Sequence, residues 1–459
     1  KMKIQDKFLK KYNKSGPRYT SYPPATFFTP EYKNFDLKNS VILSNNEDPQ
    51  NISVYIHIPF CPQLCHFCGC TTETGFTKPF LHSYVDAIIK EIKLVAKEIN
   101  PNRKLTQVHW GGGTPNAIAY NHIENITNAI KESFTFTDNY EMAIECSPAY
   151  FEFKHIELLK QFGFNRISLG IQDFRQDVLD AINRKGPKLP ILDIINKIKE
   201  EGFTGTNIDL VYGLPLQTVE SFNDTIDMAI ALDTDRIVTF SYAHVPSFIE
   251  RQKVLEKIGF PSLKDKAKMY QNAYDKFTKA GYIPIGMDHF AKPHDEFAIA
   301  LENKNLHRNF QGYCTRATTG QVYGFGASSI SQLYSAYSQN EKKAARYIDR
   351  IEKEGLAVIR GYHMTNRDKI VRQVINEVMC NYYVDINVVA KDFGVTTENI
   401  YQAVEFSIQK FEEFIKDGLM NIEGDEIKVN ETGRLVIRNI AMKFDPLLTK
   451  GVGIYSKTI

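Results

Sequence analysis

The chain has 459 residues, of which 43% are hydrophobic and 24% are charged, so it has a globular composition and is too long for one compact core. Its 56 basic and 54 acidic residues are spread along the chain and leave a net charge of +2. This balance argues against a nucleic-acid or membrane partner and favours a small molecule. The charged start, and the lack of any run of the ~18 apolar residues that a membrane span needs, predict a cytoplasmic protein, which we expect to be monomeric.

Residues 1–50 are predicted to form an N-terminal arm that packs on the domain after it. They are rich in Tyr, Pro, Asn and Ser and show little periodicity. The centre of the arm reads Arg18-Tyr19-Thr20-Ser21-Tyr22-Pro23-Pro24.

Residues 51–290 are predicted to form the main domain. From about residue 52 to 241, short apolar runs alternate with amphipathic stretches, which predicts parallel strands joined by helices. Between the first two strands, Leu81, Val85, Ile88, Ile92 and Val95 recur at helical spacing. Six such units predict an α/β fold, a partial (β/α)6 TIM-like barrel with its site at the C-terminal ends of the strands. The strands are expected at 53–58, 106–110, 141–145, 166–170, 207–212 and 236–242.

Two further regions follow the predicted barrel. Residues 291–364 are interpreted as a barrel extension and connector, and residues 365–459 as a smaller, mostly helical C-terminal domain. In that domain, residues 419–422 and 426–429 flank Gly424-Asp425 as a hairpin. Helices with a hairpin wing predict a winged-helix-like domain.

Four of the seven cysteines fall within ten residues, and three of them, Cys61, Cys65 and Cys68, have the spacing Cys-x3-Cys-x2-Cys directly after the first predicted strand. Such spacing lets one loop wrap three thiolates around a [4Fe-4S] cluster and leaves one iron open for a ligand. The alternative is structural zinc, which uses four ligands in two separated pairs, but no matching second pair follows here. The sequence therefore favours the cluster.

Polar and glycine residues gather at the ends of the other predicted strands. The second strand ends in Gly111-Gly112-Gly113-Thr114-Pro115, which is either a tight turn or a place where the backbone approaches a ligand. Asp209 lies within an apolar strand, where it meets either a ligand in the cleft or a basic neighbour such as Arg184.

Cys-x3-Cys-x-aromatic-Cys after the first strand resembles the radical-SAM superfamily. The resemblance implies that the open iron chelates S-adenosylmethionine (SAM) and that the reduced cluster cleaves it to a 5′-deoxyadenosyl radical. The glycine run after the second strand is similar to the superfamily motif that holds the methionyl amino group.

Over essentially its full length, the chain also resembles the oxygen-independent coproporphyrinogen III oxidase family. The residues that carry this resemblance are the arm Arg18 to Pro23, the extra Cys70, the segments Asn207 to Pro215, Met287 to Phe290 and His307 to Tyr313, and Gly433 to Ile440 with Phe444-Asp445. The pair Cys146-Ser147 departs from the family's usual small apolar residue and acid, and the role of Cys70 stays open.

The resemblance implies two SAM molecules. Residues matched to the cluster-bound molecule are Tyr55, Gly112, Glu145 and Ile330. Residues matched to the second molecule are Phe67, Gly113, Thr114, Gln172, Arg184, Asp209 and Ala243.

The substrate implied by the resemblance is coproporphyrinogen III, two of whose propionates become vinyl groups in haem biosynthesis. Because Arg and Tyr donors suit carboxylates, the candidate substrate residues are Arg18, Tyr19, Tyr22 and Arg308. His57 and His289 are interpreted as buried, satisfied histidines. No catalytic side chain is assigned, and a reducing electron donor such as flavodoxin or ferredoxin is expected as a partner.

Three alternatives compete with this interpretation. Radical-SAM proteins that open the haem ring while transferring a methyl group keep the same three cysteines. A haem chaperone of the same fold generally lacks Cys70 and the arm motif. A nucleic-acid-binding role for the winged-helix-like tail is disfavoured by the acidic face of its predicted helical stretch, residues 398–417.

Overall fold

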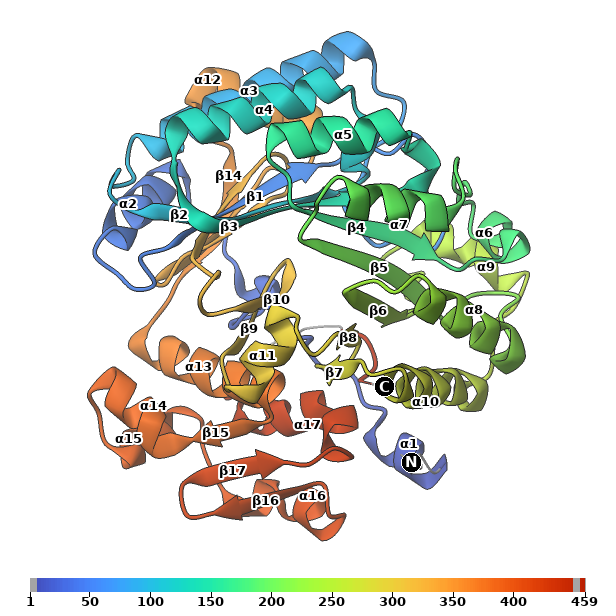
Figure 1. The fold of residues 1–459 in the computed structure, drawn as a ribbon. Helices are drawn as coiled ribbons and strands as arrows, with labels where there is room; N and C mark the ends of the chain where they lie inside the picture. The colour runs from blue at the N-terminus through green and yellow to red at the C-terminus, as the bar shows by residue number, and fades with distance from the viewer. Residues whose placement is uncertain (1–5, 449–454, 459) are drawn as a thin grey trace. The chain divides into compact units, whose positions relative to one another are not determined.

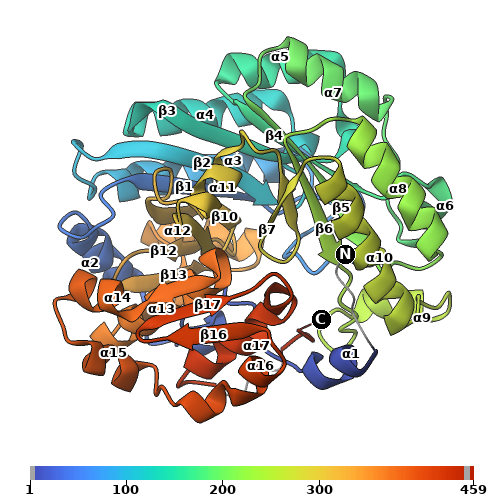
Figure 2. The same ribbon diagram turned by 60° about the horizontal axis from the view of Figure 1, so that its bottom comes forward.

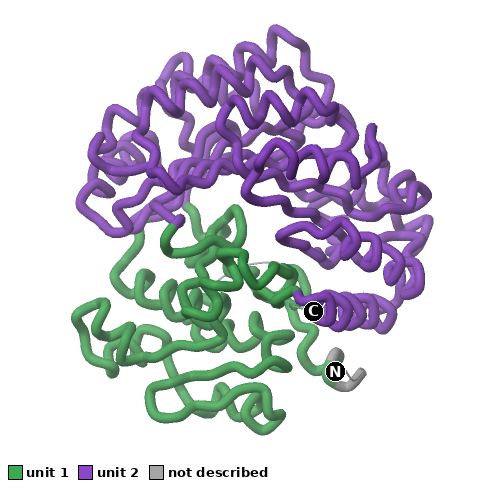
Figure 3. The backbone as a smooth tube through the Cα atoms, in the orientation of Figure 1, with its two compact units in different colours: residues 1–28, 282–317, 363–459 green, residues 29–281, 318–362 purple. Residues whose placement is uncertain are grey.

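The computed structural model describes residues 6–448 and 455–458, and the chain divides into two compact units (Figure 3). Unit 1 comprises residues 1–28, 282–317 and 363–459, and unit 2 comprises residues 29–281 and 318–362. Of the described residues in the predicted arm, 6–28 belong to unit 1 and 29–50 belong to unit 2. The domain limits drawn from the sequence stay predictions.

Unit 2 is built on a twisted sheet whose strands follow the order β14-β13-β12-β11-β1-β2-β3-β4-β5-β6 (Figure 1). All neighbours from β1 to β6 are parallel, which confirms the predicted strands and the partial barrel. The strands are β1 (Ile52–Ile58), β2 (Lys104–Gly112), β3 (Thr135–Cys146), β4 (Arg166–Gln172), β5 (Gly205–Tyr212), β6 (Arg236–Ser241), β11 (Gln321–Phe325), β12 (Ile330–Gln332), β13 (Ala336–Asn340) and β14 (Val358–His363).

The sheet extends beyond β1 in a way that the sequence analysis missed. β11 pairs with β1 in parallel, on the side opposite to β2, and β12 and β13 continue the sheet antiparallel. β11 has five residues and is followed by strands rather than by a helix, so the alternation that predicted β1 to β6 is absent there.

Helices cover one face of this sheet. In Figures 1 and 2, α3, α4, α5, α7 and α8 all lie on the same side of β1 to β6. The helices of unit 2 are α2 (Asn34–Ser44), α3 (Lys78–Ala96), α4 (Tyr120–Ser133), α5 (Phe153–Phe162), α6 (Gln176–Ala181), α7 (Ile191–Glu200), α8 (Val219–Ala231), α9 (Lys253–Glu256), α10 (Leu263–Lys279) and α12 (Ala344–Glu354).

Local signals fix where these helices begin and end. α3 begins after Thr77, whose side chain accepts a hydrogen bond from the Phe80 amide at 3.3 Å. α5 ends at Gly163, whose φ of 104° suits a residue without a Cβ. The predicted helical positions from Leu81 to Val95 are buried on α3, which confirms that it packs through an apolar face.

The two faces of the parallel strands differ in chemistry. Val54, Ile56 and Trp110 are at most 1% exposed and lie on the apolar face. The other face carries polar side chains, and the strand register pairs Tyr55 with His109. The core of unit 2 therefore lies between the sheet and the helices, and the polar face is left for chemistry.

Unit 1 combines helices with two small sheets and one further antiparallel pair of strands. β9 and β10 form an antiparallel hairpin, β7 pairs with β8, and β15, β17 and β16 form a sheet in that order. The elements are α1 (Asp6–Tyr12), β7 (Ile283–Ile285), β8 (His289–Ala291), α11 (Glu296–Glu302), β9 (Leu306–Asn309), β10 (Gly312–Thr315), α13 (Asn366–Asn381), β15 (Tyr383–Asp385), α14 (Ile386–Phe393), α15 (Thr397–Ala403), α16 (Glu412–Lys416), β16 (Met420–Glu423), β17 (Glu426–Val429) and α17 (Ile437–Ala441).

The predicted C-terminal hairpin is confirmed, because β16 pairs antiparallel with β17. The predicted helical stretch 398–417 is wrong, since it is split between α15 and α16, with Glu405 at a φ of 48° between them. The first residues of the chain are tied into the same unit: Ser15 forms a β-bridge with Lys457, and the Arg438 guanidinium donates to the Pro17 carbonyl at 3.1 Å. Among the described residues, the structure has no helix of the length and hydropathy that a membrane crossing requires.

Candidate active site

The cysteine loop follows β1 and is closed by backbone hydrogen bonds. The Cys61 amide donates to the Glu73 carbonyl at 3.0 Å, and the Glu73 amide donates to the Pro59 carbonyl at 2.7 Å. Cys61, Cys65 and Cys68 are free thiols that are partly exposed. A short closed loop therefore presents three thiols at the C-terminal end of β1, as predicted.

The glycine run at the end of β2 packs directly on this loop. The Gly113 amide donates to the Ile58 carbonyl at 2.7 Å, and the Thr114 amide donates to the Phe60 carbonyl at 2.9 Å. A Cβ on Gly113 would lie 2.8 Å from the Phe60 carbonyl oxygen and 3.0 Å from the Cys61 sulfur. The absence of a side chain there thus allows β2 to approach the cysteine loop.

Polar groups also reach the sulfur atoms. The Thr114 hydroxyl lies 3.2 Å from the Cys61 sulfur, and an Arg184 Nη1 lies 3.5 Å from the Cys65 sulfur. The Cys70 amide donates to the Cys68 sulfur at 3.4 Å. N–H and cationic groups at these positions favour the thiolate form that ligates metal.

The pKa values of the three thiols differ. Burial raises the pKa of Cys61 to about 11 and also raises that of Cys65, although Arg184 opposes both shifts. The pKa of Cys68 is lowered to about 6, first by its hydrogen bond with Cys70. Metal binding requires all three thiols to lose their protons. Because burial disfavours the thiolate forms of Cys61 and Cys65, binding of the metal must supply the free energy of deprotonating them.

The residues present fit a cluster better than a single ion. A structural zinc site takes four ligands, whereas this loop presents Cys61, Cys65 and Cys68 beyond the end of β1. A [4Fe-4S] cluster is larger than a single ion, and three thiols on one loop can bind three of its four irons.

Two carboxylates lie on the polar face near the strand ends. Glu145, on β3, accepts a hydrogen bond from His109 Nε2 at 2.8 Å, and the His109 ring stacks on Tyr55 with 6.1 Å between centroids. Asp209, on β5, accepts one from the Ser168 hydroxyl at 3.3 Å. Burial, and then the charge of Glu145, raise the pKa of Asp209 to about 7. This edge of the sheet therefore holds excess negative charge.

Arg184 is close to both features. Its guanidinium donates to the Gly170 carbonyl, and its charge lowers the pKa of Asp209. The two expectations for Asp209, a ligand or a basic neighbour, are therefore not exclusive.

A second polar layer lies deeper in the same face. Arg166 Nε donates to Glu141 at 3.0 Å and Arg166 Nη1 donates to Asn207 at 2.9 Å, while the Gln107 amide donates to Glu141 at 3.1 Å. These side chains come from β2, β3, β4 and β5, so the layer ties four strands together beneath the site.

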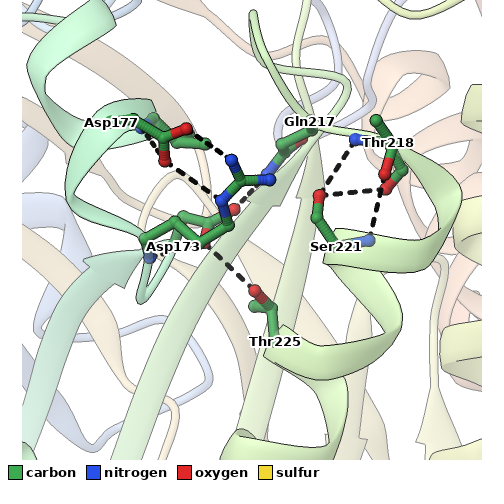
Figure 4. Close-up of polar contacts among 8 residues, drawn as sticks. Asp173, Asp177, Gln217, Thr218, Ser221 and Thr225 are labelled. Atoms are coloured by element: carbon green, nitrogen blue, oxygen red, sulfur yellow. Dashed lines mark hydrogen bonds and ion pairs between the residues drawn. The ribbon is translucent and has the colours of Figure 1, made fainter.

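A buried network fixes the loops after β4 and β5 (Figure 4). Asp173 accepts hydrogen bonds from Gln217 at 2.7 Å and from Thr225 at 3.1 Å, and Gln217 also donates to the Val211 carbonyl at 2.9 Å. Gln172, immediately before Asp173, has a φ of 69°, a left-handed conformation that few non-glycine residues adopt. The network thus holds in place a strained residue at a strand end.

Two residues that the sequence analysis missed, Arg251 and Gln252, contact the cysteine loop from a segment that follows β6 in the chain. Gln252 Nε2 donates to the Phe67 carbonyl at 3.0 Å and the Ala243 carbonyl at 3.2 Å, and Arg251 donates to the Cys68 carbonyl. They lie on a short 3-10 turn, Glu250–Gln252, and no local pattern in the sequence marks them.

The structure gathers most, but not all, of the predicted site residues. His57 is satisfied, as predicted, by Tyr55 at 3.0 Å, the Thr71 carbonyl at 3.1 Å and Ser328 at 3.2 Å. Ile330 begins β12 and packs on Gly324, the residue of β11 that pairs with Tyr55. Tyr55 lies within β1 and Asp209 within β5. Residues at or just beyond the ends of β1 to β6 are Cys61, Cys65, Phe67, Cys68, Gly112, Gly113, Thr114, Glu145, Gln172 and Ala243. The substrate candidates Arg18, Tyr19, Tyr22 and Arg308 all lie in unit 1.

Three thiols and a glycine run at the C-terminal ends of parallel strands define a radical SAM protein, and residues 55–229 match the Radical SAM superfamily model. The superfamily's [4Fe-4S] cluster and SAM are therefore the cofactors of this chain. The oxygen-independent coproporphyrinogen III oxidase of Synechocystis is 39% identical over 96% of this chain and 94% of its own length. The enzyme of that name from Escherichia coli is 38% identical over 96% of this chain and 94% of its own.

A solved structure of Escherichia coli coproporphyrinogen III oxidase, described as a radical SAM enzyme, matches with a TM-score of 0.87 at 37% identity. The match covers 94% of this chain and 98% of that one. The chain belongs to the oxygen-independent coproporphyrinogen III oxidase family, and is thus a radical-SAM oxidoreductase. This confirms the predicted family and fold, and it does not favour the haem ring-opening or chaperone alternatives.

Proposed function

We propose that this protein carries out the anaerobic oxidative decarboxylation of two propionate side chains of coproporphyrinogen III. The products are two vinyl groups and protoporphyrinogen IX, in haem biosynthesis. The observation that carries the proposal is the packing of the glycine run on the cysteine loop, in a chain 39% identical over 96% of its length to an enzyme of that name.

In this proposal Cys61, Cys65 and Cys68 hold the cluster. When bound, the cluster and SAM supply the 5′-deoxyadenosyl radical that removes a hydrogen atom from the propionate β-carbon. The decarboxylating substrate also gives up one electron to an acceptor. Thr114 and Arg184 favour the ionised thiols, because they lie 3.2 Å and 3.5 Å from two of the sulfur atoms.

The carboxylates on the polar face suit a cationic cofactor. SAM carries an ammonium and a sulfonium group, and Glu145 and Asp209 lie in partly buried positions where their negative charge is incompletely neutralised. His109 orients Glu145 through a 2.8 Å hydrogen bond. We assign one SAM molecule to Tyr55, Gly112, Glu145 and Ile330, and a second to Phe67, Gly113, Thr114, Gln172, Arg184, Asp209 and Ala243.

The partners belong to the same proposal. Arg18, Tyr19, Tyr22 and Arg308 bind propionates of the substrate. A reducing electron donor such as flavodoxin or ferredoxin supplies the electron that opens each turnover, and the protein acts in the cytoplasm as a monomer.

The test is an anaerobic assay of the iron-reconstituted protein with SAM, a reductant and coproporphyrinogen III. We expect CO2, vinyl product and 5′-deoxyadenosine to appear together. Formation of 5′-deoxyadenosine without CO2 would contradict the substrate while leaving the cofactor chemistry intact. In that case, a methylated, ring-opened product in a parallel assay with haem in place of coproporphyrinogen III would support the ring-opening alternative.

A further inference from the structure

Unit 1 brings several arginines together around one partly buried carboxylate, that of Asp288. The Arg308 guanidinium donates to the Arg18 carbonyl at 2.9 Å. Burial opposes ionisation of Asp288, but His289, Arg308 and Arg18 outweigh it and lower its pKa. Burial and then the charges of Arg18 and Arg308 lower the pKa of Arg438 to about 9. Asp288 in turn raises the pKa of Arg308, so this acid offsets part of the positive charge of the cluster.

The nearby carboxylates are already engaged. Asp288 lies 2.7 Å from His289 Nδ1, and Asp445 accepts a hydrogen bond from the Tyr19 hydroxyl at 2.8 Å. Each of the two acids thus has a partner other than Arg18 and Arg308.

Arg438 and Arg308 use their donors in different ways. A guanidinium has five N–H donors. Arg438 donates to the backbone carbonyls of Gly16, Pro17 and Lys457, so it is a structural tie. Arg308 donates to the Arg18 carbonyl alone, and its Nε is buried without a partner among the described residues.

Further unused donors lie nearby. Arg308 lies over the Tyr313 ring, 5.2 Å from its centroid, and the hydroxyl of Tyr313, a residue only 7% exposed, has no hydrogen-bond partner in the described structure. Arg434 lies over the Tyr382 ring at 4.2 Å, and its Nε is likewise buried and unpaired among described residues. Tyr382 links the two, because it interacts electrostatically with Arg434 and with Arg308.

An unpaired buried donor destabilises a fold, so several in one place indicate a ligand that satisfies them. Arg18 is exposed and forms no side-chain hydrogen bond in the described residues, which leaves a route from solvent. Arginine forks match planar carboxylates in particular.

We infer that Arg18, Arg308 and Arg434, with the Tyr313 hydroxyl, form an anchoring site for carboxylates of a polycarboxylate tetrapyrrole. This inference rests on the proposed function for the identity of the ligand, and it adds Arg434 and Tyr313 to the substrate residues. Two of the four propionates keep their charge throughout the reaction, and this site binds such carboxylates. Binding here requires neither radical formation nor reduction of the cluster.

The test uses coproporphyrin III, the oxidised tetracarboxylate, which is fluorescent and does not turn over. It is titrated anaerobically into the iron-reconstituted full chain with SAM and without reductant. Because a charge-assisted hydrogen bond is involved, we expect about tenfold to a hundredfold weaker binding in Arg18→Gln, Arg308→Gln and Arg434→Gln. Coproporphyrin tetramethyl ester, which has no carboxylates, should bind the wild type and the three variants equally.

Arg367→Gln is the matched control. Arg367 is also in unit 1, but its guanidinium is paired with Glu405 at 3.0 Å, so this variant should bind coproporphyrin III like the wild type. Arg18→Gln removes no side-chain hydrogen bond of the described structure, so its effect on binding does not arise from misfolding. Thermal unfolding and an Arg308→Lys variant, which keeps the charge and loses the fork, separate folding from recognition at the partly buried positions.

The outcomes are distinct. Unchanged affinity in folded Arg18→Gln and Arg308→Gln overturns the anchoring site, even if the wild type makes vinyl product. Displacement of coproporphyrin III by an equal concentration of inorganic phosphate would also overturn it, since it would indicate a general anion site. Loss of binding in the variants while the wild type makes no vinyl product would support the site and contradict the proposed function instead.

Discussion

The polar face of the sheet in unit 2 carries two layers of charged side chains that differ in how completely they are paired. In the deeper layer, Arg166 bonds both Glu141 and Asn207, at 3.0 and 2.9 Å. In the layer near the strand ends, Glu145 accepts a hydrogen bond from His109 at 2.8 Å, and its charge still raises the pKa of Asp209. The deeper layer thus holds the strands together, while the outer layer keeps charge available for a cationic ligand.

We expect the largest effect from a substitution in the cysteine loop, which belongs to neither layer. Cys68→Ser should abolish cluster incorporation and activity, because three close-set thiolates hold the cluster and serine is a poor ligand for it. Iron content and visible absorption after anaerobic reconstitution measure this. Cys146→Ala is the control, since Cys146 is buried at the end of β3 and should leave iron content unchanged. Full iron loading of Cys68→Ser would contradict the assignment.

Breaking the deeper layer should affect stability more than any outer-layer change. Arg166→Ala leaves Glu141 in a position where its side chain is only 14% exposed, and losing one partner of such a pair costs about 3–5 kcal/mol of unfolding free energy. Denaturant titration of the reconstituted protein measures the loss. Arg175→Ala, which removes an exposed partner of Asp177, should cost less than about 1 kcal/mol. Equal losses in the two variants would show that the deeper layer has no special role.

In the outer layer, Glu145→Gln should act on cofactor binding rather than on stability. The substitution keeps the shape and the acceptor oxygen for His109 but removes the charge that an ammonium group requires. We expect the KM for SAM to rise about tenfold to a hundredfold. Steady-state formation of 5′-deoxyadenosine measures it, with unfolding monitored in parallel. A fall in stability without a change in KM would assign Glu145 to the structural layer.

The features that could be predicted from the sequence are those formed by residues close together in the chain. β1 to β6 follow from apolar runs and intervening helical periodicity, and the three cysteines lie within eight residues of one another. The sequence did not predict α2, whose N-terminus lies in a region that lacks a clear periodic pattern. Arg251 was also missed, because it reaches the Cys68 carbonyl across 183 residues. Pairing between layers depends on strand register, which no single segment specifies.

The smallest expected effect concerns Asp209 and has a sign that depends on pH. Burial and Glu145 raise its pKa from 3.8 to about 7, while Ser168, Arg184 and His109 oppose the shift. Between those values the folded state binds more protons than the unfolded state, so stability falls as pH rises from about 4 to 7 and the cost is complete above 7.

Asp209→Asn removes that charge. The variant should therefore unfold at higher denaturant concentration than the wild type at pH 8, by roughly 1–2 kcal/mol, with a smaller difference at pH 5. The variant should at the same time lose activity, because the Asp209 carboxylate is proposed to bind SAM. In the absence of that ligand, the same carboxylate destabilises the folded protein. A variant that is less stable at pH 8 would place Asp209 in a structural ion pair and remove the distinction between the two layers.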